Sequence, residues 1–267
     1  MTAQSLSPNT IRERVRVITQ VEAQTQTNPL TLSPADITMW LATLPTPITR
    51  HCYYVHLRAW FRWLVANDLR QDDPMIKVIA PKRPKYEPRP ITDAQLRAAL
   101  GQDSLRHSTR TRIILAAFAG LRVHEIAKIQ GQDLDRVTGL LQVLGKGNKQ
   151  SIVPVHPIII NEAKSYPPRG WWFPSHTNHG EHVNSRAIAQ SIVDAFARVG
   201  VTMTSHQLRH YFATALLEGG ADARVVQTLM RHENLSTTAL YMGVSVKQQK
   251  AALDALLMPN AFTQFLF

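Results

Sequence analysis

The stretch SHQLRHYFATALLEGGADARVVQTLMRH, residues 205–232, decides the fold of the second half of the chain. Its apolar residues recur every three or four positions, which predicts one helix over 206–218 and a second over 222–230. The first turn of the first helix carries His206 and Arg209, three residues apart and on the same face. Either both are solvated at a helix end, or both reach a common ligand.

The composition bounds the class of protein. The chain has 267 residues, of which 44% are hydrophobic, as expected for one large or two ordinary globular domains. No apolar run is long enough to span a bilayer, and residues 1–20 lack the apolar segment of a secretory signal. The single cysteine, Cys52, excludes an internal disulfide and a cysteine-rich zinc site, and we interpret it as a small core residue. We expect a cytoplasmic protein.

The net charge points to a polyanionic partner. Lysine and arginine number 30 against 19 acidic residues, which gives a formal charge of +11. An excess of this size favours nucleic acid. Charge alone does not separate DNA, RNA and an acidic membrane, so the choice depends on the motifs.

The first 80 residues predict an all-helical domain. Ser7-Pro8 and Ser33-Pro34 each open an amphipathic helix. A third helix runs from about Pro47 to Asn67, with an apolar stripe that includes Tyr53, Val55, Leu57, Trp60, Phe61 and Leu64. Its other face is basic, and it is either solvated or directed at DNA; we favour DNA and name as contacts Arg50, Arg58 and Arg62.

A proline-rich segment separates this domain from the rest. Ala80 to Ile91 reads APKRPKYEPRPI, and its four prolines exclude regular structure. We therefore predict a core-type DNA-binding domain over 1–80, a linker over 81–91 and a catalytic domain over 92–267. The basic residues of the linker would suit a strap along a phosphate backbone: Lys82, Arg83, Lys85 and Arg89.

The second domain is predicted to be mostly helical with a small antiparallel sheet. RIILAAFAGLRVHEIAKI, residues 112–129, gives two helices that meet at Gly120. GLLQVLGKGNKQSIVPV, residues 139–155, gives two strands around a turn that carries Lys146 and Lys149. Further helices are expected at about 184–199 and 237–256, besides the two described above. The fold class is mainly α, in two domains.

Six polar residues of this domain fit one chemical need. Phosphoryl transfer places negative charge on the non-bridging oxygens, and planar guanidinium groups bind such oxygens in pairs. A tyrosine needs cationic neighbours to become a nucleophile, and a leaving alkoxide needs a proton donor. Each residue alone is more often structural or solvated; the candidates are Arg122, Lys146, His206, Arg209, His232 and Tyr241.

The chain resembles the tyrosine recombinase (phage integrase) family. The segments GLRVHE, LGKGNKQSIVPV and SHQLRHYFATALLEGGADARVVQTLMRHENLSTTALY look like that family's successive boxes, and the resemblance covers nearly the whole chain. The intervals of 23 residues from Arg209 to His232 and of 9 from His232 to Tyr241 look like the Xer-type members. Type IB topoisomerases share the chemistry, but the box spacing disfavours them.

The resemblance implies a role for each residue. Arg122 and Arg209 would bind the scissile phosphate, and Tyr241 would attack it to give a 3′-phosphotyrosine. Lys146 would protonate the departing 5′-oxygen. His206 would act as acid, base and orienter of the nucleophile, while His232 would support the non-bridging oxygens.

Three further positions qualify the resemblance. Glu125 matches the family's acidic position behind the catalytic arginine, although it could be an ordinary charge at a helix start. Lys149 matches the second, non-catalytic lysine of the turn, and we expect it to bind DNA. Arg231 stands where the family usually has a glycine with a backbone angle that other residues avoid. Either the turn differs, or Arg231 adds a phosphate contact.

No metal or cofactor is expected. His176, His179 and His182 are regularly spaced, but their segment SHTNHGEHV reads as a polar loop rather than a zinc site. The phosphotyrosine bond retains the energy of the phosphodiester, so a nucleotide is not required.

We therefore expect a site-specific DNA recombinase that acts on double-stranded DNA inside a bacterial or phage-infected cell. A phage integrase of a short form, without an arm-binding domain before Ser7, is the first choice. An Xer-like resolvase and a non-catalytic DNA-binding regulator are the alternatives, and the tyrosine disfavours the regulator. We expect a monomer in solution and a homotetramer that holds two DNA sites together while recombination passes through a Holliday junction. The tail over 256–267 would dock on its own core or on a neighbouring protomer.

Overall fold

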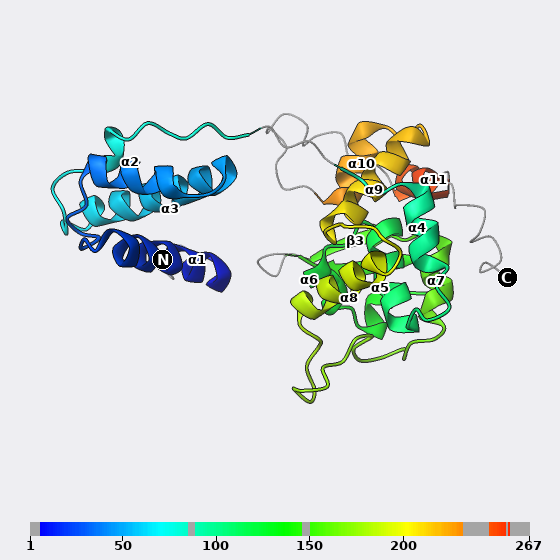
Figure 1. The fold of residues 1–267 in the computed structure, drawn as a ribbon. Helices are drawn as coiled ribbons and strands as arrows, with labels where there is room; N and C mark the ends of the chain where they lie inside the picture. Colours follow the sequence, from blue (N-terminus) through cyan, green and yellow to red (C-terminus); the bar gives the residue numbers. More distant parts are fainter. Residues whose placement is uncertain (1–5, 85–88, 146–149, 232–245, 255, 257–267) are drawn as a thin grey trace. The chain divides into compact units, whose positions relative to one another are not determined.

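The computed structural model describes residues 6–84, 89–145, 150–231, 246–254 and 256, and for 246–249 it describes the backbone alone (Figure 1). The chain divides into two compact units, Met1–Glu87 and Pro88–Phe267. Each has a hydrophobic core of its own. No helix in the described parts is long and apolar enough to cross a membrane.

Within its described residues, 6–84, the first unit consists of three α-helices and one short 3₁₀ helix. They are α1 (Pro8–Thr25), α2 (Pro34–Thr43), α3 (Pro47–Ala66) and η2 (Pro74–Ile76). Each α-helix begins with a hydroxyl residue followed by proline. The hydroxyls of Ser7, Ser33 and Thr46 accept the backbone N–H three residues on, and proline occupies the first helical position, where no N–H is needed. The predicted all-helical character is confirmed.

The interpretation of Cys52 as a core residue is wrong, and so is the place of Val55 in the apolar stripe of α3. Cys52 is exposed, and Val55 is 49% exposed. The stripe that is buried contains Leu57, Phe61 and Leu64, which follow one another at helical spacing. Cys52 and Val55 lie five and two residues before Leu57 in the chain, and at helical spacing this turns both away from that face.

The second unit is a helical domain with one small sheet. Its helices are α4 (Asp93–Leu100), α5 (His107–Phe118), α6 (Val123–Ala127), η3 (Gly131–Asp133), α7 (Pro157–Ala163), α8 (Ser185–Ala197), α9 (His206–Glu218), α10 (Ala223–Met230) and α11 (Val246–Asp254). The central helix is α5, which contacts α6, α7, α8 and α9. All six residues from Ile113 to Phe118 are buried, so α5 has almost no solvent face in its second half.

The sheet has three antiparallel strands in the order β1 (Leu134–Asp135), β2 (Leu140–Leu144) and β3 (Gln150–Pro154). The register of the hairpin pairs Leu144 with Gln150 and Leu140 with Pro154. This is the two-stranded hairpin that the sequence predicts, while β1 and α7 were not predicted. The helix predicted over 237–256 is described only as α11, because residues 232–245 lie outside the described part of the chain.

Candidate active site

A glycine turn joins α5 to α6 and places the first candidate arginine. Gly120 has a φ of +58°, a left-handed conformation that glycine adopts without strain. A Cβ at this position would lie 2.5 Å from Cδ1 of the Phe212 ring on α9, so there is no room for a side chain. The Gly120 carbonyl accepts hydrogen bonds from two guanidinium groups, those of Arg209 and Arg231. The turn is therefore both a tight packing point and an acceptor for cations.

Glu125 fixes Arg122, which is the N-cap residue of α6. The Arg122 backbone N–H donates to Glu125 Oε2 at 2.7 Å, and Arg122 Nη1 donates to Glu125 Oε1 at 3.0 Å. The carboxylate is 1% exposed, whereas the Arg122 side chain is 31% exposed. The buried carboxylate thus holds one edge of a guanidinium that still faces solvent.

Burial alone would raise the pKa of Glu125, but its cationic neighbours reverse the direction. Arg231, the Arg122 backbone N–H, the Arg122 side chain and Arg209 together hold the pKa of the Glu125 carboxyl below its usual value. Glu125 is therefore ionised at neutral pH, and it stabilises the arginines around it.

Arg209 projects from α9 into the core of the unit and is only 1% exposed. Its Nη1 and Nη2 donate to the backbone carbonyls of Gly120 and Met230. Burial lowers the pKa of its guanidinium to about 9, and the positive charges of Arg122 and Arg231 add to that effect. Its Nε is buried and has no hydrogen-bond partner among the described residues. The interpretation of Arg209 as a solvated helix-end residue is therefore wrong.

Arg231 ends α10 in the left-handed conformation, with φ 51° and ψ 46°. The turn thus keeps the backbone geometry for which glycine would be favoured. The side chain is 9% exposed, and its Nη2 donates to Glu125 Oε2 at 3.0 Å and to the Gly120 carbonyl at 3.3 Å. Nη1 donates to the Leu229 carbonyl at 3.0 Å. Of the two alternatives drawn from the sequence, a different turn is wrong. A phosphate contact by Arg231 stays a prediction, and the contact that the structure describes is with Glu125.

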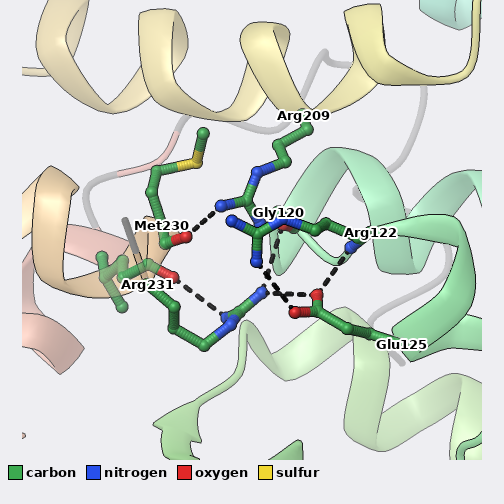
Figure 2. A network of polar contacts seen from close by, with 7 residues as sticks. Gly120, Arg122, Glu125, Arg209, Met230 and Arg231 are labelled. Carbon is green, nitrogen blue, oxygen red and sulfur yellow. Dashed lines mark hydrogen bonds and ion pairs between the residues drawn. The ribbon is translucent and has the colours of Figure 1, made fainter. Parts of the chain in front are cut away.

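The three guanidinium groups gather at Gly120 and Glu125, although they come from the α5–α6 turn, from α9 and from the end of α10 (Figure 2). Three cations and one carboxylate leave two positive charges without a described counter-charge. The low pKa of Arg209 has the same origin, since it reflects burial and like charge. A cluster of this kind favours an anion that accepts hydrogen bonds from planar donors, such as a phosphate.

The structure brings Arg122, Glu125 and Arg209 together, and it places His206 one helical turn before Arg209 on α9. His206 is the first residue of α9 and is exposed, with its ring 4.6 Å from that of His210 between centroids. Leu208, Phe212 and Leu216 are buried, as the helical spacing predicts. The remaining candidates lie outside the described residues: Lys146, His232 and Tyr241.

Two features of the site were missed from the sequence. One is the Gly120 carbonyl as the acceptor for two arginines, which the sequence could not indicate because every residue has a backbone carbonyl. The bond between Arg231 and Glu125 is the other, and its only signal was an arginine where glycine is usual. Their separation of 106 positions along the chain explains why no local pattern revealed it.

The predicted DNA contacts differ in exposure. Arg50 is half-buried, and its Nε donates to the Leu44 carbonyl at 2.9 Å, so it joins α3 to the end of α2. The others that the structure describes are exposed: Arg58, Arg62, Lys82, Arg83 and Arg89. Lys85 and Lys149 lie outside the described residues.

The histidine loop shows local contacts. The His182 ring meets the Trp171 ring edge to face, and His182 Nδ1 lies 2.8 Å from the Val183 carbonyl. In the described part of the chain, no group of three or more histidine, cysteine, aspartate or glutamate side chains could hold a metal ion.

Comparison with known proteins identifies the family. The phage integrase family model matches residues 92–248. The tyrosine recombinase XerD of Caulobacter vibrioides is 35% identical over 211 residues, which are 71% of this chain and 68% of that protein. The tyrosine recombinase XerC of Chlamydia pneumoniae is 29% identical over 218 residues, 73% of this chain and 67% of that protein.

Solved structures agree with this assignment. The integrase of mycobacterium phage Brujita is 37% identical, with a TM-score of 0.60, and covers 99% of this chain and 93% of its own. Lambda integrase (75–356), solved as a dimer bound to a COC′ core site, is 17% identical, with a TM-score of 0.71. The match covers 91% of this chain and 94% of that one, and it shows a shared fold. The chain belongs to the phage integrase family and is a tyrosine-type site-specific recombinase, an enzyme that breaks and rejoins DNA.

Proposed function

We propose that the chain is a phage-type integrase that cuts and rejoins DNA through a 3′-phosphotyrosyl bond at Tyr241. The observation that carries the proposal is the arginine cluster. Arg209 is buried and Arg122 is held by one edge, and both belong to a group with excess positive charge. A phosphodiester brings the missing negative charge.

The two arginines would stabilise the pentacoordinate transition state. The exposed edge of Arg122 remains available because Glu125 occupies the other edge. Arg209 is held by two backbone carbonyls and retains N–H groups for the phosphate, among them the buried Nε. Donors fixed before the reaction need no rearrangement when charge develops on the non-bridging oxygens.

The covalent step exchanges one phosphoester for another. The phenolic oxygen of Tyr241 attacks phosphorus and gives up its proton to a base, a role that we assign to His206. The bond to the 5′-oxygen breaks, and Lys146 supplies the proton to that oxygen. His232 supports the non-bridging oxygens. A 5′-hydroxyl from a second strand reverses the step, so neither a nucleotide nor a cofactor is consumed.

DNA binding would use the basic surfaces of both units. Arg58 and Arg62 are exposed on α3, and Lys82, Arg83 and Arg89 are exposed at the linker predicted over 81–91. A lambda integrase tetramer has been solved bound to a Holliday junction. By analogy we propose a monomer in solution and a homotetramer on two joined sites in the cell's cytoplasm.

The integrase and the Xer-like resolvase are the two candidate functions. The Brujita integrase matches 99% of this chain at 37% identity, and this level of identity over nearly the whole chain favours an integrase. The XerD of Caulobacter vibrioides is 35% identical over 71% of this chain, and the XerA recombinase is 23% identical over 99% of it. The non-catalytic DNA-binding regulator is disfavoured, because the chain belongs to a family of DNA-cleaving enzymes and a regulator has no use for a nucleophilic tyrosine.

A recombination assay with two substrate designs tests the proposal. DNA from either side of the gene supplies candidate sites, placed on two separate molecules or as two copies on one plasmid. We expect the purified chain to join the separate molecules. Resolution of the plasmid without joining would favour the resolvase, and DNA binding with neither reaction nor covalent adduct would favour the regulator.

A further inference from the structure

The proposed chemistry assigns no role to Arg231, although both its backbone conformation and the burial of its charge are unfavourable. It holds a left-handed backbone conformation that disfavours any residue with a Cβ, and its guanidinium is desolvated. Burial lowers the pKa of that guanidinium, although Glu125 opposes the effect. A buried cation in a strained turn points to a specific partner.

We propose that Arg231 is a positioning residue, which fixes Glu125 and through it the phosphate-binding edge of Arg122. This inference rests on the proposed role of Arg122 at the scissile phosphate.

The hydrogen bonds define the path from Arg231 to Arg122. Glu125 Oε2 accepts from Arg231 Nη2 at 3.0 Å and from the Arg122 backbone at 2.7 Å. Oε1 is then directed at Arg122 Nη1, also at 3.0 Å. Arg231 is the one side chain described on Oε2, and together with the Arg122 backbone N–H it fixes the orientation of the carboxylate. Without Arg231, the Glu125 carboxylate can rotate, and the Arg122 guanidinium bonded to Oε1 can turn away from the phosphate with it.

Arg231 also joins two elements that carry the site. Its other bonds go to the carbonyls of Gly120, in the α5–α6 turn, and of Leu229, in α10. Arg209 bridges the same two regions through Gly120 and Met230. The end of α10 and the turn that presents Arg122 are therefore connected by two arginines, of which Arg231 alone also reaches the carboxylate (Figure 2).

A direct phosphate contact by Arg231 is the weaker interpretation. The side chain is 9% exposed, whereas that of Arg122 is 31% exposed. Both of its terminal nitrogens already donate to protein oxygens. Its Nη2 is already paired with an anion, the Glu125 carboxylate, whereas the terminal nitrogens of the buried Arg209 donate to neutral backbone carbonyls.

The test compares strand cleavage on two nicked substrates, one ordinary and one with a neutral methylphosphonate at the scissile position. Arg231→Met keeps the backbone strain and the aliphatic stem but removes the charge. Arg122→Ala removes the proposed phosphate contact itself. Arg198→Met is the matched control, since Arg198 is an exposed arginine at the end of α8 that donates to Gln102.

On the ordinary substrate, we expect Arg231→Met to slow cleavage by about 10- to 100-fold, which is the scale of a misplaced reacting group, at unchanged DNA affinity. Arg122→Ala should slow it by about 10²–10³-fold. On the methylphosphonate, which has no charge to neutralise, both variants should approach the rate of the unmodified protein. Arg231→Lys, which keeps the charge, should lie between, and it replaces Arg231→Met if that variant does not fold.

Each outcome has a separate meaning. If Arg122→Ala is rescued by the methylphosphonate and Arg231→Met is equally slow on both substrates, Arg231 is merely structural and the inference is wrong. If Arg122→Ala itself is not rescued, the proposed role of Arg122 fails first. An Arg231→Met protein that cleaves the ordinary substrate as fast as Arg198→Met also overturns the inference.

Discussion

Substitution of Gly120 by alanine should destabilise the second unit far more than the same substitution at Gly200. Both glycines have positive φ, +58° and +74° respectively. A Cβ at Gly120 would lie 2.5 and 2.9 Å from two atoms of the Phe212 ring and 3.3 Å from Met230 Sδ. Nothing lies within 4 Å of a Cβ at Gly200. The pair thus separates steric conflict from backbone strain.

The expected magnitudes follow from these two contributions. An alanine in the left-handed conformation lowers the free energy of unfolding by about 1–2 kcal/mol. The reduced freedom of the unfolded chain raises it by about 0.4–1 kcal/mol, and both effects apply equally to the two sites. Overpacking adds about 1–3 kcal/mol at Gly120 alone. Phe212 is 1% exposed, so its ring cannot relieve the conflict by moving into solvent. We therefore expect Gly120→Ala to cost about 1–3 kcal/mol more than Gly200→Ala.

Hydrogen–deuterium exchange of the slowest amides in α5 and α9 measures this difference in the full-length chain, because such amides report the opening of the whole unit. Gly120→Ala should also reduce strand cleavage, because the Gly120 carbonyl receives both Arg209 and Arg231. Equal loss of protection in the two alanine variants would refute the steric argument, and with it the tight approach of α9 to the turn.

Three further predictions concern the leaving group, pH and salt. Lys146→Ala should slow cleavage sharply on normal DNA and recover on a substrate with sulfur at the 5′-bridging position, because a thiolate leaves without a proton; a quench-flow assay that shows no recovery would remove Lys146 from the role. Burial lowers the pKa of His156 to about 4, so the unfolded chain binds more protons between about pH 6.5 and 4. The stability of the second unit should therefore decrease as the pH is lowered from about 6.5 to 4, by at most about 1.4 kcal/mol per pH unit from this group. His156→Asn, which keeps the acceptor for the Ile158 N–H, should flatten this dependence in urea titrations. Arg58→Gln and Arg62→Gln should each weaken DNA binding and reduce the salt slope of log affinity by about 1; an unchanged slope would show that α3 does not face phosphate.

Much of the architecture follows from local sequence signals. The Ser-Pro and Thr-Pro pairs mark the starts of three helices, since the hydroxyl caps the helix and proline needs no hydrogen bond there. The hairpin β2–β3 follows from two apolar segments around a glycine- and lysine-rich turn. Strand β1 is only two residues long, which is too short for any periodic pattern.

The chemistry of the site was only partly predictable. Arg122, Glu125 and Arg209 could be picked out because their residue types and spacing resemble a known family. The burial of Arg209 and the bond between Arg231 and Glu125 could not, because they depend on how α9 and α10 pack against the α5–α6 turn. Cys52 shows the opposite error, in which an apolar neighbourhood in the sequence suggested a core position that the helix places in solvent.

The central claim is that Tyr241 becomes covalently bound to DNA at a site built by arginines. The most direct measurement is peptide mass spectrometry of the SDS-resistant adduct formed on a nicked DNA site in excess EDTA. We expect a nucleotide phosphate attached to Tyr241, and no adduct from Tyr241→Phe although that variant still binds the site. An adduct on another residue, an adduct that persists in Tyr241→Phe, or one that forms only with added Mg²⁺ would contradict the claim.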